Sequence, residues 1–235
     1  MRMLVSVRSV EEALLAADGG ADFIDLKEPS AGALGGLPTA TIRAIVAALR
    51  ARGTALPHLL PISATIGDLP MDDVLAILAR VSEVGDCCVD YVKVGITREP
   101  GAAPVLAALA RCKHPVVPVF IADQGLDADL IDRACALHFP ALMADTADKQ
   151  LGSLFDAVRL PDLQRFVTRV RSSDALVGLA GALHLEHVAA LQVLAPDFAG
   201  FRSAVCAGDR RAALDPHRLR ELVTLVRALS GDIKV

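Results

Sequence analysis

Short apolar runs alternate with longer amphipathic stretches from one end of the chain to the other. The first apolar run, 3–7, has the length of a buried strand, and 9–20 follows it with the spacing of an amphipathic helix. Ser9 with Glu12 three residues later predicts a capping box where this helix begins, and a glycine pair predicts its end. The same pair of elements then recurs along the whole sequence.

This repetition predicts eight strands and eight helices. The strands are expected within 3–7, 22–29, 59–67, 91–96, 115–123, 141–146, 175–183 and 198–206. The helices are expected within 9–20, 38–53, a segment opening near Met71, 104–112, 126–138, 161–172, 184–195 and 215–229. A long loop is expected between the sixth strand and its helix.

Strands that alternate with helices imply a parallel sheet, and eight such units in 235 residues imply that the sheet closes into a barrel. We therefore expect an α/β protein with a single TIM-type (βα)8-barrel catalytic domain over 1–235. The alternative is an open, doubly wound sheet. It is less favoured because no glycine-rich segment of the GxGxxG type follows the first strand.

The composition agrees with a compact globular protein and narrows its partners. Hydrophobic residues make up 53% of the chain and charged residues 22%, which excludes a disordered or fibrous protein. The net charge of -4 provides no basic excess for a phosphate backbone, so we expect no nucleic-acid partner. Aromatic residues make up only 3%, so the core must be aliphatic.

The apolar runs and the cysteines indicate the cellular compartment of the protein. The longest apolar runs are about half the length needed to span a bilayer, so no membrane partner is expected. The five cysteines are odd in number and form no CxxC pair, which argues against a disulfide framework and against a zinc site. We expect a cytoplasmic protein with reduced cysteines and no bound metal. A homo-oligomer is also expected.

Several polar residues interrupt the apolar strands on the face that should point into the barrel. Side chains alternate between the two faces of a strand, so Asp25 and Lys27 share the inward face while their apolar neighbours meet the helices. By the same alternation, Lys93, Asp145 and Arg202 point inward from the fourth, sixth and eighth strands. Barrel active sites form where the C-terminal ends of the strands meet the loops, so these residues are candidates for chemistry.

Lysine is scarce in this chain, and its placement is informative. Only five of the 24 basic residues are lysines, yet Lys27 and Lys93 stand inside apolar strands and Lys149 follows the sixth strand. Lysine can act as a neutral nucleophile when it is buried or crowded by other cations, whereas arginine cannot. The alternative is that each lysine pairs with Asp25 or Asp145, or extends to the rim of the barrel. The presence of two inward lysines together favours a catalytic role for them.

The remaining candidates would contact substrate. Ser63 and Thr65 share one face of the third strand and are expected to reach the mouth. Gly181 in the seventh strand, Arg202 in the eighth and Gly208 in the turn that follows the eighth fall in the quarter of a barrel that commonly binds phosphate. Backbone amides and an arginine fork would suit a phosphate dianion. The alternative is equally compatible with the sequence: the glycines would serve only to form turns, and the arginine would form an ion pair.

The same residues carry a family resemblance. LVSVRSVEEALLAADGGADFIDLKEPSAGALG, SATIGD, DYVKVGI, ADTADKQLGSLFD, LAGAL with EHV, and FRSAVCAGDR resemble successive blocks of the (5-formylfuran-3-yl)methyl phosphate synthases. The blocks run in order from residue 4 to about residue 211. The family has a TIM-barrel fold, which agrees with the expectation above. One departure is Ser203, where members from archaea carry glycine.

The resemblance implies a reaction and roles for individual residues. Members of this family condense two molecules of glyceraldehyde 3-phosphate, with loss of one phosphate and two waters, on the way to methanofuran-type one-carbon carriers. By resemblance, Lys27 is the Schiff-base lysine and Lys93 a proton-transfer lysine. Asp25, Asp145 and Lys149 match further active-site positions. The substrate would be a phosphorylated triose, and no metal or organic cofactor would be needed.

Two other functions remain compatible with the sequence. The first is an imine-forming class I aldolase that acts on another sugar phosphate, since it would need the same lysines. The second is a non-catalytic barrel that binds a phosphorylated metabolite, which would form no covalent adduct. Product analysis separates the first from the synthase, and trapping of an imine separates the second.

Overall fold

The computed structural model describes residues 1–32, 34–52, 60–148 and 152–231, and it contains a closed barrel of eight parallel strands. The strands follow one another around the barrel in sequence order, and β1 pairs with β8 to close it. They are β1 Arg2–Val7, β2 Phe23–Leu26, β3 Ile62–Thr65, β4 Tyr91–Ile96, β5 Val116–Ile121, β6 Ala141–Asp145, β7 Leu176–Leu179 and β8 Phe198–Phe201. The predicted fold class is confirmed. Seven strands lie within their predicted ranges, and β1 begins one residue before its range, at Arg2.

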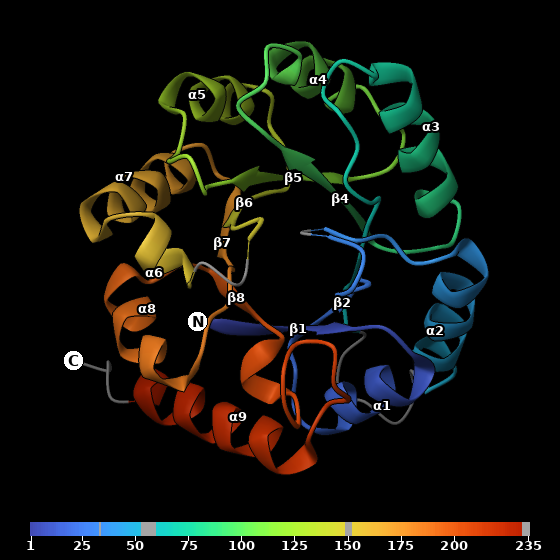
Figure 1. Cartoon of the computed structure of the whole chain (residues 1–235), viewed down its shortest axis with the longest axis vertical. Coiled ribbons are helices and arrows are strands. Elements are labelled where there is room, and N and C mark those ends of the chain that lie inside the picture. Colours follow the sequence, from blue (N-terminus) through green and yellow to red (C-terminus); the bar gives the residue numbers. More distant parts are fainter. Residues whose placement is uncertain (33, 53–59, 149–151, 232–235) are drawn as a thin grey trace.

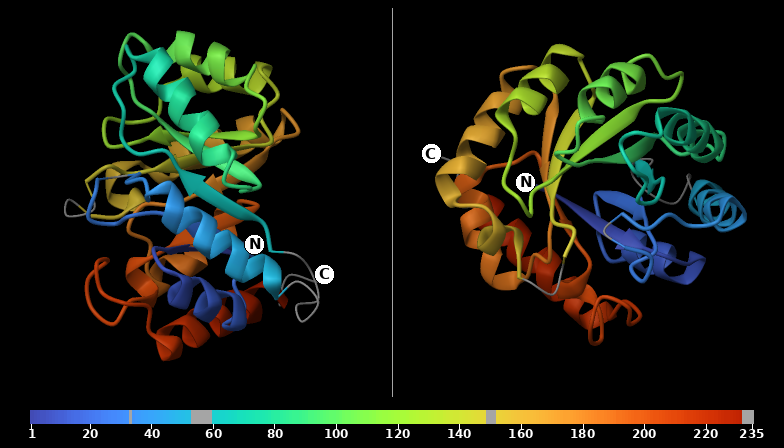
Figure 2. Two further views of the ribbon diagram at one scale, coloured as in Figure 1. Left: turned by 90° about the vertical axis from the view of Figure 1, so that its right-hand side faces the viewer. Right: turned by 45° about the horizontal axis from the view of Figure 1, so that its top comes forward.

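Helices surround the barrel as an outer ring (Figure 1), and the turned views show them covering the outside of the strands (Figure 2). They are α1 Val10–Asp18, α2 Thr39–Ala51, α3 Val74–Gly85, α4 Ala102–Leu109, α5 Ala128–Ala136, α6 Leu154–Ala157, α7 Leu160–Arg171, α8 Val188–Leu194 and α9 Pro216–Gly231. Two 3-10 turns, η1 Leu185–His187 and η2 Ser203–Val205, lie after β7 and β8. None of the helices in the described ranges is both long and apolar enough to cross a bilayer.

The capping at the starts of α1 and α3 differs from the prediction for local reasons. At the start of α1 the Ser9 hydroxyl accepts a hydrogen bond from the Glu12 amide, as expected, but the Glu12 carboxylate accepts from the amide of Arg8. Only half of the predicted capping box forms. The third helix begins at Val74 rather than near Met71, because the Asp73 side chain caps it.

One short helix was not predicted. Helix α6 occupies part of the expected long loop between β6 and α7, and a capping box between Ser153 and Asp156 starts it. Four residues are too few to show a helical period in the sequence. This helix lies beside the site because the Leu154 amide donates to the carbonyl oxygen of Gly181, after β7.

The alternation of strand side chains divides the apolar core into two layers. The outward residues of the strands, such as Ile24, Val92 and Leu142, pack among the helices in the larger cluster. A smaller cluster fills the inside of the barrel; it contains Leu4, Leu34, Val117, Val119, Ala141, Met143, Ala180 and Phe198. The apolar filling stops below the strand ends, and charged residues take its place there.

Candidate active site

Asp25 is the centre of a polar layer that the strand register builds. The register places Ser6 of β1 and Ser63 of β3 directly beside Asp25 of β2. The Ser6 hydroxyl donates to Asp25 Oδ2 at 3.1 Å, and the Ser63 hydroxyl donates to Oδ1 at 2.6 Å. Two neutral donors therefore fix the orientation of this buried carboxylate.

Each inward lysine lies against a different buried carboxylate. Lys93 Nζ is 3.0 Å from Asp25 Oδ1, and Lys27 Nζ is 3.3 Å from Asp145 Oδ2. The four side chains are between 2% and 8% exposed. Removing one partner from a buried ion pair costs about 3–5 kcal/mol of folding free energy, because the remaining charge stays desolvated. Loss of one partner from either pair is therefore expected to destabilise the fold.

The lysines and carboxylates line one cavity at the mouth of the barrel. It has a volume of about 520 Å³, part of which is its open entrance. Asp25, Lys27, Lys93 and Asp145 form its charged wall. The backbone after β7 and residues after β8 form the opposite wall; these are Ala180, Gly181, Ala182, Leu183, Arg202, Ser203 and Arg210. The predicted catalytic residues that the structure describes therefore share one chamber.

The turn after β7 presents backbone to this cavity. Gly181 has φ +120 and Ala182 has φ +43, so two successive residues adopt conformations that favour glycine. A Cβ atom on Gly181 would lie 2.9 Å from the Thr146 hydroxyl, which leaves no room for a side chain. Turns of this kind make concave surfaces in which backbone amides bind anions.

Arg202 lines the cavity but its guanidinium is already engaged. Its terminal nitrogens donate to both carboxylate oxygens of Glu12, at 2.5 and 3.1 Å, and the two side chains are 10% and 8% exposed. Three backbone carbonyl oxygens accept its other N–H groups. The five donors of an arginine are thereby used. We therefore replace the predicted phosphate contact of Arg202 by a structural role.

Arg210 is the arginine whose charge faces the lysines. Its Nη2 donates to the carbonyl oxygen of Gly32 at 3.5 Å, across the mouth from its own loop. Burial lowers the pKa of the Arg210 guanidinium from its ordinary value, and the negative charge of Asp145 opposes this shift. An arginine nevertheless stays protonated at physiological pH. The sequence favours Arg202 as the cation of the turn after β8, whereas in the structure Arg210 has this position.

The other predicted contact residues have supporting positions. Ser63 lies beside Asp25 and donates a hydrogen bond to its carboxylate, as described above. Thr65 is fully buried, and its hydroxyl donates to the carbonyl oxygen of Gly35 at 2.8 Å, so it holds the loop after β2 instead of facing substrate. Gly208 is exposed in the loop after β8 and does not belong to the described residues that line the cavity. Lys149 lies outside the described residues.

Sequence reasoning missed two residues that shape the site. Ser6 carries the same signal as Asp25, because it is an inward polar residue in an apolar strand. Leu34 has no such signal: it belongs to the loop after β2, yet it is buried inside the barrel mouth with Val119 and Met143. Asp68 holds it there by accepting a hydrogen bond from the Leu34 amide at 3.1 Å.

The fold and these side chains define a TIM-barrel protein with a buried lysine–carboxylate centre at the mouth of the barrel. Residues 3–223 match the family described as 4-HFC-P synthase. The chain belongs to this family, and since relatives at 31% to 34% identity are named synthases, it is an enzyme.

Individual relatives match over nearly their full length. A protein of Methylorubrum extorquens is 38% identical over 97% of this chain and 92% of its own length. The (5-formylfuran-3-yl)methyl phosphate synthase of Archaeoglobus fulgidus is 34% identical over 98% of this chain and all of its own. The one of Methanocaldococcus jannaschii is 32% identical over 97% of this chain and all of its own.

Solved structures at lower identity agree with the fold. Phosphoribosyl anthranilate isomerase from Thermus thermophilus is 20% identical and aligns with a TM-score of 0.65, covering 97% of this chain and 100% of that protein. Dihydrodipicolinate synthase from Bacillus clausii is 12% identical with a TM-score of 0.67, covering 98% of this chain and 74% of that protein. At these identities the likeness extends to the barrel alone.

Proposed function

We propose that this protein condenses two molecules of glyceraldehyde 3-phosphate to (5-formylfuran-3-yl)methyl phosphate, in the synthesis of a methanofuran-type one-carbon carrier. The observation that carries the proposal is the pair of buried lysines in one cavity, each against its own carboxylate. The family resemblance and the names of the relatives support the substrate and the product. The reaction balances: two molecules of triose phosphate give one furan phosphate, one inorganic phosphate and two waters.

Lys27 is the proposed nucleophile. Its neutral amine adds to the aldehyde carbon of one substrate, and loss of water leaves a protonated imine. The imine accepts electrons, so it acidifies the adjacent C–H bond and permits C–C bond formation and elimination of phosphate. The Lys27 amine must first give up a proton, and Asp145 Oδ2 at 3.3 Å is within reach of it.

Lys93 and Asp25 form the proposed proton-transfer pair. They are in direct contact, and the hydroxyls of Ser6 and Ser63 hold the carboxylate in place. A proton taken from the carbon next to the imine can therefore move between Lys93 and Asp25 without a change in their positions. Fixed geometry of this kind raises the efficiency of general acid–base catalysis.

The turn after β7 and Arg210 form the proposed phosphate subsite. Both line the cavity opposite the lysines, at the quarter of the barrel where phosphates commonly bind. Arg210 supplies a permanent positive charge, and the turn after β7 supplies backbone amide groups. Ser203 also lines this wall.

The purified protein is expected to make a furan from glyceraldehyde 3-phosphate alone. The measurement follows the absorbance of the furan aldehyde together with released inorganic phosphate, and the two should appear in equal amounts. A sugar phosphate product without the furan would favour the aldolase instead. Binding of substrate without any product or borohydride-trapped adduct would favour the non-catalytic barrel.

Arg210→Ala is expected to raise KM for glyceraldehyde 3-phosphate by about 10- to 100-fold, the scale of one charge-assisted hydrogen bond in a sheltered site. Competitive inhibition by inorganic phosphate should weaken by a similar factor. Arg211→Ala is the matched control, because this neighbour is exposed and does not belong to the described lining of the cavity. Unchanged KM in Arg210→Ala would place the phosphate elsewhere.

A further inference from the structure

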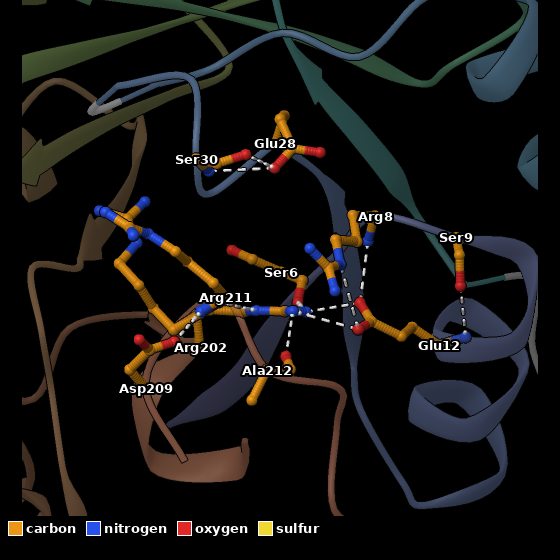
Figure 3. A network of polar contacts seen from close by, with 11 residues as sticks. Ser6, Arg8, Ser9, Glu12, Glu28, Ser30, Arg202, Asp209, Arg211 and Ala212 are labelled. Atoms are coloured by element: carbon orange, nitrogen blue, oxygen red, sulfur yellow. Dashed lines mark hydrogen bonds and ion pairs between the residues drawn. The ribbon is translucent and has the colours of Figure 1, made fainter. Parts of the chain in front are cut away.

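Arg202 connects three parts of the chain that meet at one side of the cavity. Its Nη1 donates to the carbonyl oxygen of Ser6 at 3.0 Å, in β1, and both terminal nitrogens contact Glu12 in α1. Figure 3 shows the guanidinium of Arg202 between Glu12 and Ala212. The remaining acceptors lie in the segment after β8.

That segment is the β8–α9 loop, 207–213. Cys206 and Leu214 pair at its base, and the Ala207 amide donates to the carbonyl oxygen of Ala213 at 3.0 Å. Arg202 holds the loop from below: its Nε donates to the carbonyl oxygen of Arg210 at 2.9 Å, and its Nη2 to that of Ala212 at 2.8 Å. The backbone of Arg210 therefore has its position set by Arg202.

The side chain of Arg210 leaves this fixed backbone on the other side and enters the cavity. It lines the chamber with Lys27, Lys93 and Asp145, and it reaches the carbonyl oxygen of Gly32 across the mouth. A shift of the β8–α9 loop by an ångström would move the Arg210 charge by at least as much, since a side chain moves with its backbone. The position of the Arg210 charge in the phosphate subsite thus depends on the contacts that hold the β8–α9 loop.

We infer that the Glu12–Arg202 ion pair is a positioning device that holds the β8–α9 loop so that Arg210 meets the substrate phosphate. This inference rests on the proposed function, which supplies the phosphorylated substrate. All five donors of Arg202 are used within the protein: Glu12 accepts two of them, and the carbonyl oxygens of Ser6, Arg210 and Ala212 accept the rest. Both are positioning residues.

The chemistry of the two side chains explains why this pair suits the task. An arginine offers five donors in a rigid plane, so one side chain can hold two loop carbonyls and still bind a carboxylate with both ends. A lysine has one ammonium and cannot span these acceptors. Glu12 compensates the Arg202 charge, and its two oxygens accept from both terminal nitrogens of Arg202.

Hydrogen exchange of the β8–α9 loop tests the positioning directly. In Arg202→Lys and in Glu12→Gln, the amides of Ala207 and Ala212, which are hydrogen-bonded within the loop, should exchange at least about tenfold faster than in the parent protein. KM for glyceraldehyde 3-phosphate should rise at least about tenfold, while kcat should change less than KM because the lysines are untouched. Arg202→Lys keeps the charge, so a direct phosphate contact would survive it in large part.

Arg8→Gln is the matched control. Arg8 also lies beside Glu12, with Nε 3.8 Å from the carboxylate, but within the described ranges its polar contacts do not include the β8–α9 loop. This variant removes one positive charge next to Glu12 and should leave loop exchange and KM within about twofold of the parent values, as expected for a partly exposed ion pair. A large effect of Arg8→Gln would show that charge, and not positioning, controls the site.

A double variant tests whether Arg202 affects phosphate binding through Arg210 or by a contact of its own. If Arg202 works by placing Arg210, adding Arg202→Lys to Arg210→Ala should raise KM no further, whereas independent contacts would multiply their effects. Multiplied effects, or unchanged loop exchange in Arg202→Lys and Glu12→Gln, would overturn the inference. Calorimetric binding of inorganic phosphate by the same variants keeps this test separate from the reaction: absence of furan synthesis with intact phosphate binding would overturn the proposed function alone.

Discussion

Lys27→Arg is expected to abolish furan formation while the barrel stays folded. Arginine keeps the positive charge opposite Asp145 but has no amine that can form an imine at neutral pH. Turnover should therefore fall at least about 10³-fold, as expected when a covalent nucleophile is removed. The thermal unfolding midpoint should change little, because an ion pair with Asp145 remains possible.

Borohydride trapping locates the imine. With glyceraldehyde 3-phosphate present, reduction should add mass to the peptide that contains Lys27, and Lys27→Arg should show no adduct. Lys113→Arg is the matched control, since Lys113 is exposed and lies away from the described lining of the cavity. It should leave trapping and turnover unchanged. An adduct on Lys93 or Lys149 would contradict the assignment of Lys27.

Lys93→Met is expected to reduce furan formation by about 10²- to 10⁴-fold, the usual contribution of a general acid or base. Methionine has a similar length but carries no proton, so trapping at Lys27 should remain possible, at least at alkaline pH. The measurement compares the rate of furan formation with the yield of borohydride adduct. Near-normal turnover would mean that Lys93 serves only as an ion-pair partner.

Stability provides the control for this variant. Lys93→Met leaves Asp25 buried without its cation, which should cost about 3–5 kcal/mol of folding free energy. The double variant Asp25→Asn with Lys93→Met removes both charges and should recover much of this loss. If the double variant is stable but still inactive, the lost activity belongs to the missing proton transfer. Recovered activity would show that Lys93→Met had merely damaged the fold.

The sequence predicts the barrel and the charged wall of the cavity because both follow from strand periodicity. A period of two residues is enough to place Asp25, Lys27, Lys93 and Asp145 on the inner face. It does not say which lysine meets which carboxylate. That pairing depends on how far each strand is displaced along the barrel, and Lys27 crosses to Asp145 while Lys93 contacts Asp25.

The role of Arg202 could not be predicted for a different reason. Its acceptors include the carbonyl oxygens of Ser6, Arg210 and Ala212, and every residue type carries a carbonyl, so the sequence contains no sign of these bonds. Leu34 is similar, because an apolar residue in a loop is common and only the loop path brings it into the barrel. Loop geometry is therefore the part of the site that the structure adds.

The Lys27–Asp145 contact joins residues 118 positions apart in the sequence, one directly after β2 and the other at the end of β6. A ribosome therefore makes the proposed nucleophile well before it makes the carboxylate that faces it. Until β6 joins the sheet, the Asp145 carboxylate is not in place beside Lys27. The proposed proton acceptor for the Lys27 amine therefore becomes available only after β6 has joined the barrel.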